Sequence, residues 1–237
     1  MKSLVLFAFF ISFIFTSCSK DNASLLRGMG YEADGTGLLE AVDNDDMKAL
    51  EIFLKMPELL NFADKSGKNA VMIAASKKEC TMLKKLVAAG ANLTIMDNSE
   101  KTPLHYAAAG ASEECASFLL ENGADADLQD NFGRDAANIL VALAKEENIG
   151  LFKTLVGKSN DPERRDKDKK TLFILATEKG YADYIKFLIS LGVSPLSKDF
   201  SGKTALDYAA ESFDAGRLDS GTFEEISAYT QKIKEKL

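Results

Sequence analysis

The chain has 237 residues, of which 46% are hydrophobic and 27% charged, with a formal net charge of -7, three cysteines and one histidine. This composition is typical of a soluble globular protein and excludes a disordered or fibrous chain. The acidic excess gives no electrostatic reason to expect nucleic acid as a partner, because neutralising phosphates needs clustered cations. A single histidine argues against a zinc site built on imidazoles, and we expect neither a metal nor another cofactor.

Residues 1–17 have the pattern of a signal peptide, with a cationic start and an apolar run from Leu4 to Phe15. A helix of this length spans about 18 Å, short of the roughly 30 Å of a bilayer core, which favours a removable export signal over a membrane anchor. The run ends in Phe15-Thr16-Ser17-Cys18, which resembles the lipobox of bacterial lipoproteins. That resemblance implies lipidation of Cys18. The alternative is an ordinary signal peptidase site at the small residues.

Residues 18–30 are predicted to be a lipidated N-terminus and a polar tether. Acyl chains on Cys18 would hold the protein at a membrane, since each buried methylene contributes about 0.8 kcal/mol. No aspartate directly follows Cys18. By resemblance to lipoprotein sorting, this favours the outer over the inner membrane.

The remainder of the chain repeats, because Asp64, Asp97 and Asp130 recur every 33 residues in matching surroundings. The clearest unit carries Thr102-Pro103-Leu104-His105 five residues after its aspartate. This pattern resembles the ankyrin-repeat family, which implies an all-α solenoid of about six helix-turn-helix units joined by β-hairpin loops. The predicted repeat domain, 31–237, divides into units near 31–63, 64–96, 97–129, 130–165, 166–198 and 199–237.

The motif residues have mechanical roles in such units. Thr102 and Pro103 start a helix, since threonine caps exposed N–H groups and proline has none to lose. In the family, residues at the positions of Leu104 and His105 are structural, and the histidine braces neighbouring hairpins. The last unit is predicted to end in a helix from Phe223 to about Lys236, which Thr222 begins.

Cys80 and Cys115 are predicted to be free thiols. Both fall in second helices of adjacent units, and stacked helix axes lie about 10 Å apart. A disulfide needs Cα atoms within about 7 Å.

The fourth unit departs most from the pattern, with Asp135 in place of threonine and about three added residues around 144–150. No nucleotide-binding, nucleophile or metalloprotease motif is present, so we expect no enzymatic activity. A less favoured alternative places a catalytic site in this insertion.

The family resemblance implies a binding surface on the hairpin tips and first helices. A basic column precedes five helix starts and consists of Lys68, Lys101, Arg134, Lys170 and Lys203. It favours an acidic patch on a protein partner. Alternatively, the nearby aspartates neutralise it. Phe132 and Phe200 near the tips are either exposed anchors or covers over the next hairpin.

Together these features predict a lipid-anchored, non-catalytic scaffold or protective binder of another envelope protein. The alternative function is a secreted effector that binds host proteins.

Overall fold

The computed structural model describes residues 21–77 and 80–237, and within them the helices are arranged in pairs. The first helices of the pairs are α2 (Gly35–Asp43), α4 (Ala70–Ala75), α6 (Pro103–Ala109), α8 (Ala136–Leu143), α10 (Leu172–Lys179) and α12 (Ala205–Asp214). The second helices are α3 (Met47–Phe53), α5 (Thr81–Ala88), α7 (Glu113–Glu121), α9 (Ile149–Lys158), α11 (Ala182–Ser190) and α13 (Ser220–Lys234). A short 3-10 helix, η1 (Pro57–Leu59), follows α3.

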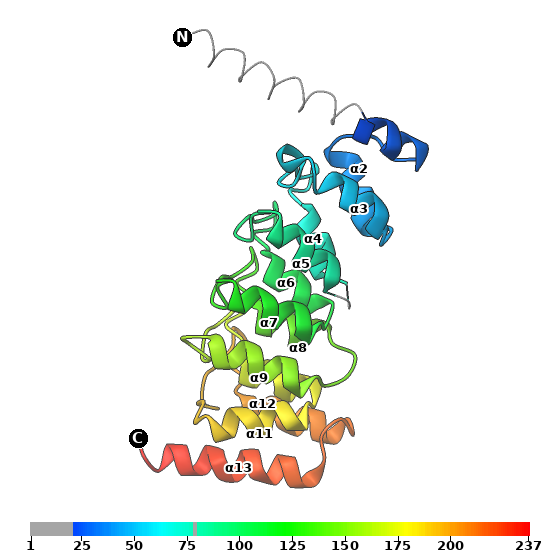
Figure 1. The fold of residues 1–237 in the computed structure, drawn as a ribbon. Coiled ribbons are helices and arrows are strands. Elements are labelled where there is room, and N and C mark those ends of the chain that lie inside the picture. Colours follow the sequence, from blue (N-terminus) through cyan, green and yellow to red (C-terminus); the bar gives the residue numbers. More distant parts are fainter. Residues whose placement is uncertain (1–20, 78–79) are drawn as a thin grey trace, which may run out of the picture.

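The pairs follow one another along a single elongated stack that ends in α13 (Figure 1). First helices pack against first helices from α2 to α12, and α7, α9, α11 and α13 pack in a second layer. Small side chains such as Ala107 and Ala108 are buried where first helices meet, and Leu119 fills the space behind them. Buried apolar residues form one continuous cluster along the stack. The predicted all-α solenoid of about six units is therefore confirmed.

The loops that lead into the first helices turn back sharply without forming regular strands in the described part of the chain. A single isolated bridge there joins Ala63 and Asn69. The expected β-hairpin loops are therefore tight turns rather than two-stranded ladders. Their tips are called the hairpin tips below.

The first helices start at residues with extended backbone. Thr102, Thr171 and Thr204 occupy this position, and the Thr171 hydroxyl accepts the N–H of Ile174. Pro103 is the first residue of α6, where its fixed φ suits the helix and its missing N–H costs nothing. The predicted helix start at Thr102 and Pro103 matches the observed boundary of α6.

Asp135 takes the threonine position in the fourth unit. Its carboxylate accepts the backbone N–H of Asn138 at 2.8 Å, and its own N–H donates to the Asn138 side chain at 3.1 Å. The side chain is buried, and burial raises the pKa of Asp135 to about 6 despite these bonds and the nearby Arg164. The fourth unit therefore keeps its helix start but places an ionisable group in the core.

The predicted tether is wrong for residues 21–28, which form a helix. Leu26 within it is fully buried, while the neighbouring Leu25 is 58% exposed. Among the described residues no helix pair precedes the first one, and an apolar residue of the N-terminal segment is buried with the core there. The signal segment and Cys18 lie outside the described residues.

The closing helix starts earlier than predicted. It begins at Ser220, and the carboxylate of Asp219 accepts the Thr222 N–H at 2.9 Å. Asp219 is therefore the capping residue, not Thr222. An aspartate in extended backbone just before a helix is a strong N-cap.

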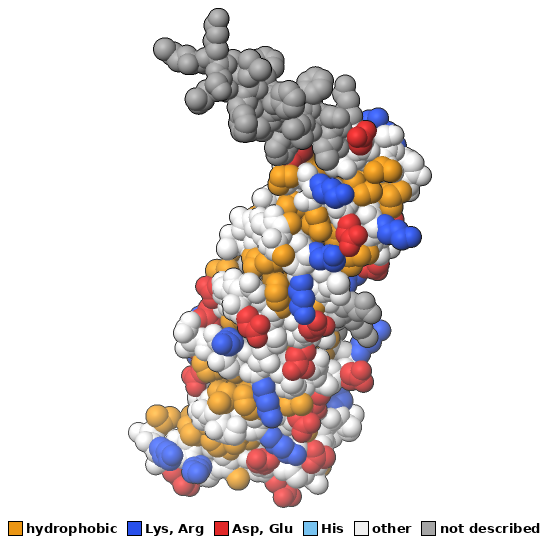
Figure 2. Space-filling model, in the orientation of Figure 1, with side chains coloured by type: hydrophobic (Ala, Val, Ile, Leu, Met, Phe, Trp, Pro, Cys, Tyr) orange, Lys and Arg blue, Asp and Glu red, His pale blue; other side chains and the backbone are white. Residues whose placement is uncertain are grey.

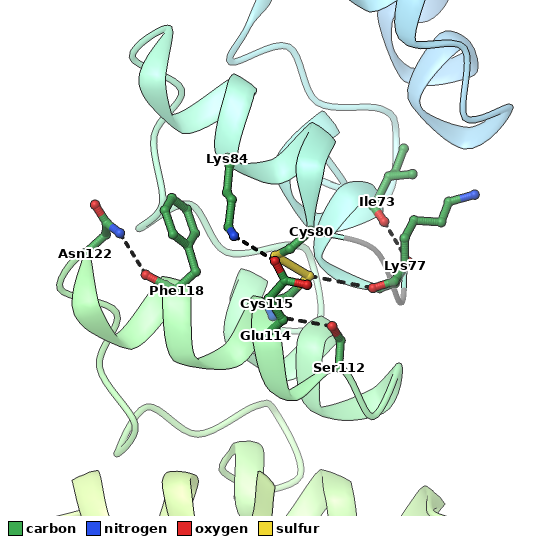
Figure 3. The surroundings of a disulfide bond; sticks show 10 residues. Ile73, Lys77, Cys80, Lys84, Ser112, Glu114, Cys115, Phe118 and Asn122 are labelled. Atoms are coloured by element: carbon green, nitrogen blue, oxygen red, sulfur yellow. Dashed lines mark hydrogen bonds and ion pairs between the residues drawn. A yellow bond between two sulfur atoms is a disulfide. The ribbon is translucent and has the colours of Figure 1, made fainter.

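The prediction of two free thiols is also wrong. Cys80 and Cys115 form a disulfide, with their Cα atoms 5.2 Å apart (Figure 3). Cys80 is the residue before α5, and Cys115 lies in the first turn of α7, so both cysteines lie at helix starts. The distance between stacked helix axes does not fix the distance between two residues at helix ends. The two sulfur atoms can therefore meet between the units.

No helix among the described residues is both long and apolar enough to span a membrane.

Truncating Leu26 tests whether the segment at 21–28 is part of the fold. We expect Leu26→Ala to lower the free energy of unfolding by about 2–4 kcal/mol, because a buried leucine is lost from the end of the stack. Leu25→Ala is the matched control and should change it by less than about 0.5 kcal/mol. Denaturant titration of both variants measures the difference. Equal effects of the two substitutions would contradict the docked segment.

Asp135→Thr restores the residue type that starts the neighbouring helices. A carboxyl group whose pKa is raised by folding stabilises the native state below the unfolded pKa, and this contribution disappears as pH rises through the folded value. The variant should therefore be more stable than the natural protein by roughly 1–3 kcal/mol at pH 7.5, with the gain vanishing near pH 4. Unfolding titrations across this pH range measure the difference. A gain that does not change with pH would show that Asp135 carries no burial cost.

Candidate protein-binding surface

Each hairpin tip is closed by an aspartate. In every case the carboxylate accepts the backbone N–H of the residue four positions later. The five aspartates are Asp64, Asp97, Asp130, Asp166 and Asp199. Aspartate is suited to this role because its short side chain reaches its own backbone and so fixes a turn. The aspartates that recur every 33 residues from Asp64 to Asp130 are therefore turn-forming residues.

Neighbouring tips are also bonded to one another through the backbone. Asn98 N–H donates to Ser66 and Asn131 N–H to Ser99, both at 2.9 Å. Farther along, Lys167 N–H donates to Phe132 and Phe200 N–H to Asp168, both at 3.0 Å. We call these five linked tips the tip row.

Glycines permit the close approach within the tip row. Gly67 and Gly133 both have positive φ, and a Cβ atom on either would lie 2.9 Å from the backbone of the next tip. A side chain at these positions is therefore excluded by sterics as well as by backbone conformation. The tip row is a preformed surface, so a partner would bind it with little loss of conformational entropy.

Phe132 and Phe200 project from the tip row and are 55% and 67% exposed. A cation lies near the face of each ring: the Arg134 guanidinium is 4.7 Å from the Phe132 centroid, and Lys169 Nζ is 4.8 Å from that of Phe200. Of the two alternatives left open by the sequence, the structure places both rings at the surface. Lys169 was not singled out in the sequence, although it lies at the fourth tip, next to the fifth tip, which carries Phe200.

The basic column is less uniform than its sequence pattern suggests. Lys68 Nζ lies 5.1 Å from the Tyr106 ring centroid in the next unit. Lys170 pairs with Glu178 at 2.7 Å, and Lys203 pairs with Glu211, which raises the pKa of Lys203. Among the described residues, Lys101 has no carboxylate within ion-pair distance. Charge on the face in Figure 2 is mixed, with basic and acidic side chains interspersed along the stack.

Arg134 is a structural residue rather than a free surface cation. It donates to the buried Asp130 carboxylate from Nε at 3.1 Å and from one terminal nitrogen at 2.8 Å. Burial acts to raise the pKa of Asp130, but the bonds from Arg134 outweigh it and lower that pKa. Reversing the charge at Arg134 would leave a buried carboxylate unpaired, so we expect it to destabilise the fold. It cannot serve as a neutral probe of binding.

Two tyrosines add further bonds beneath the tips. The Tyr106 hydroxyl donates to Asp97 at 2.7 Å, and the Tyr208 hydroxyl donates to Asp199 at 2.6 Å. Burial and these bonds raise the pKa of both tyrosines. Lys170 and Lys203 both lie 5.1 Å from the Tyr208 ring centroid. Tyrosine four residues after the helix-start threonine is the sequence signal for this arrangement.

His105 lies buried between the third and fourth units. Its Nδ1 accepts the Thr102 N–H at 3.1 Å, which leaves the proton on Nε2 to donate to the Arg134 carbonyl at 2.9 Å. Burial lowers the pKa of His105 and favours this neutral form. With both nitrogens occupied, the imidazole joins two hairpins and is not presented to a ligand. Pro103 and Leu104 are likewise buried.

The fourth-unit departures are used for bonds between units. The Asp127 carboxylate accepts from the Ser159 hydroxyl at 2.6 Å and pairs with Arg164 at 3.5 Å. The Glu147 carboxylate accepts the N–H groups of Asp183 and Tyr184 at the start of α11. An open cleft of about 650 Å³ lies beside the insertion, lined by 109–111 and 143–150. Two carboxylates line it, Glu146 and Glu147, and that of Glu147 already accepts backbone N–H groups at the start of α11.

No group of three or more potential metal ligands is found in the described part of the chain.

Comparison with known proteins agrees with this architecture. The sequence profile for "Ankyrin repeats (3 copies)" matches residues 38–130 and 139–221. Neurogenic locus notch homolog protein 1 of Danio rerio is 38% identical over 123 residues, which are 51% of this chain and 5% of that protein. Protein phosphatase 1 regulatory subunit 12A of Rattus norvegicus is 34% identical over 113 residues, which are 48% of this chain and 11% of that protein.

The chain thus spans only a small part of the length of these relatives. Ankyrin-repeat proteins are generally binding modules rather than enzymes. The matched profile covers most of the stack, and the buried histidine brace and helix-start threonines lie inside it. This chain belongs to the ankyrin-repeat family.

Proposed function

We propose that the protein is a non-catalytic binding module that is exported, held at a bacterial membrane through lipid on Cys18, and holds or shields another envelope protein. The tip row is the partner-binding surface in this proposal. The observation that carries it is the pair of exposed phenylalanines on a row of tips that backbone bonds hold in place. Exposed aromatic side chains on a rigid support are favoured anchors at protein interfaces.

The chemistry of the tip row favours a partner with carboxylates near apolar groups. Lys169 lies at the ring of Phe200, and Arg134, which is paired with the buried Asp130, lies at the ring of Phe132. Lys101 contributes a further cation at the neighbouring tip. An acidic partner would gain in association rate and orientation from these charges, and the effect would weaken with salt.

Export is supported by two independent features. The apolar run before Cys18 has the length of a signal peptide and ends in a lipobox-like sequence. The disulfide between Cys80 and Cys115 is a second feature, since disulfides persist in oxidising compartments outside the cytosol. Phe15 occupies a position where lipoboxes most often have leucine, and cleavage without lipidation would give the alternative, a secreted effector that binds host proteins.

Radioactive palmitate labelling distinguishes the anchored form from the secreted one. In a bacterial host, the full chain should incorporate label and sediment with membranes, whereas Cys18→Ala should do neither, because the acyl acceptor is lost. Cys80→Ser is the control for loss of a cysteine elsewhere and should label as the natural protein does. Equal labelling of the natural protein and Cys18→Ala, or a released unlabelled form, would remove the lipid anchor from the proposal.

Substitutions in the tip row test the binding surface. Crosslinking in native envelopes identifies the principal partner, and its capture by purified variants is then measured. We expect Phe132→Ala with Phe200→Ala to weaken capture at least about tenfold, because central aromatic anchors carry most interface energy. Lys101→Glu should weaken capture and reduce its dependence on salt.

The control is Leu191→Ala, since Leu191 is 50% exposed but ends α11 and is not a residue of the tip row. It should leave capture unchanged, and all the variants should unfold at the same temperature as the natural protein. Undiminished capture by the double phenylalanine variant would show that the tip row is not the binding surface.

A further inference from the structure

The disulfide joins two consecutive units at their helix starts. Cys80 is the residue before α5, and Cys115 is the third residue of α7. Both side chains are buried, at 1% and 0% exposure. The Cys115 sulfur also lies 3.7 Å from the Lys77 carbonyl oxygen, on the chain that enters α5 (Figure 3). The disulfide therefore fixes the start of the second helix of the second unit, α5, against the second helix of the third unit, α7.

The same position in other units is held by a hydrogen-bonding side chain. Asp46 caps α3, Ser112 caps α7 and Asn148 caps α9 by accepting backbone N–H groups of the first turn. Asp219 does the same for α13, and Glu147 of the preceding unit serves α11. Within the described residues, Cys80 makes no such bond for α5. In the part of the chain that the structure describes, the start of α5 thus carries a disulfide where other second helices have a capping side chain.

The second helices pack loosely on one another in this half of the stack. α7 packs against α9, α9 against α11, and α11 against α13, whereas α3 with α5 and α5 with α7 make few contacts in the described chain. The exposed ion pair between Lys84 and Glu114, at 2.7 Å, is a weak substitute, because exposed pairs contribute little. The disulfide therefore joins the two units at a place where capping and packing contribute little to holding their second helices together.

We propose that Cys80 and Cys115 are a modification site, oxidised after export by the protein disulfide of a thiol oxidoreductase, and that the resulting disulfide fixes the second unit against the third. One cysteine thiolate attacks the oxidant disulfide and forms a mixed disulfide, releasing one oxidant thiol. The second cysteine thiolate then attacks the bound cysteine sulfur and displaces the other oxidant thiol. The two cysteines lose two electrons and two protons, and the oxidant disulfide becomes a dithiol.

Burial determines when this oxidation takes place. A thiol that is closed off from solvent reacts slowly with a protein oxidant, since exchange needs access to the sulfur. Oxidation therefore precedes docking of α5 on α7, and the folded protein then protects the disulfide from reductants. This inference rests on the proposed export, and it is independent of the lipid on Cys18 and of the identity of the partner.

Thiol counting on the full chain tests the pairing. Protein isolated from envelopes is denatured and treated with a maleimide, and the labelled cysteines are assigned by peptide mass. Cys80 and Cys115 should label only after reduction, and Cys80→Ser should leave Cys115 reactive without it. In a parallel reaction, reduced and denatured full chain is refolded with oxidised glutathione and should form the same pair.

The two reactions separate this inference from the proposed export. Failure of the pair to form during refolding would overturn the modification site. Pairing during refolding together with reactive thiols in cells would overturn oxidation after export.

Thermal unfolding tests the role of the disulfide. The oxidised protein is compared with protein that has been reduced in denaturant and refolded in the presence of dithiothreitol. Reduction should lower the unfolding temperature by about 10 °C, as expected for a crosslink that closes a loop of this length in a chain of this size. The double variant Cys80→Ser, Cys115→Ser should show no effect of reductant, which controls for the reagent. On the native protein, reduction should be at least about tenfold slower than in denaturant. An unchanged unfolding temperature on reduction would mean that the disulfide does not hold the units together.

Discussion

Stacking of one helix pair on the next is the interaction on which the rest of the molecule depends. No pair buries its own apolar faces, so residues such as Ala107, Ala108 and Leu119 become core only when a neighbour covers them. The ends of the stack then need special covers. The N-terminal segment supplies Leu26, and α13 closes the other end. The tip row follows from the same constraint, since stacked units bring successive tips within backbone hydrogen-bonding distance.

The repeat period predicted the helices well because each motif residue acts locally. Thr102 and Pro103 start a helix through their own backbone preferences, and the recurring aspartates form turns with residues only four positions away. These effects need no knowledge of the neighbouring unit. The burial of Leu26 was not predicted because Leu26 packs at the open end of the stack. Two neighbouring leucines in a polar segment do not indicate which surface they pack against.

Contacts between units were harder to predict. The period gives the spacing of helix axes but not the direction of side chains at helix ends, so the disulfide of Cys80 and Cys115 was excluded wrongly. Arg134 has the same position in sequence as Lys101, yet it turns back onto the buried Asp130. The rings of Phe132 and Phe200 were left undecided, since exposure depends on how closely the next tip approaches. The disulfide is set by side-chain geometry across about one repeat, whereas the Arg134–Asp130 pair is set by side-chain geometry within one tip.

The preformed tip row of an exported chain is the proposed binding surface. The direct measurement is photocrosslinking in native envelopes from a benzophenone side chain placed at position 200, with position 191 as the control. We expect a discrete crosslink to one envelope protein from position 200 and none from position 191. The same crosslinks from both positions, or none from position 200 across the envelope fraction, would contradict it.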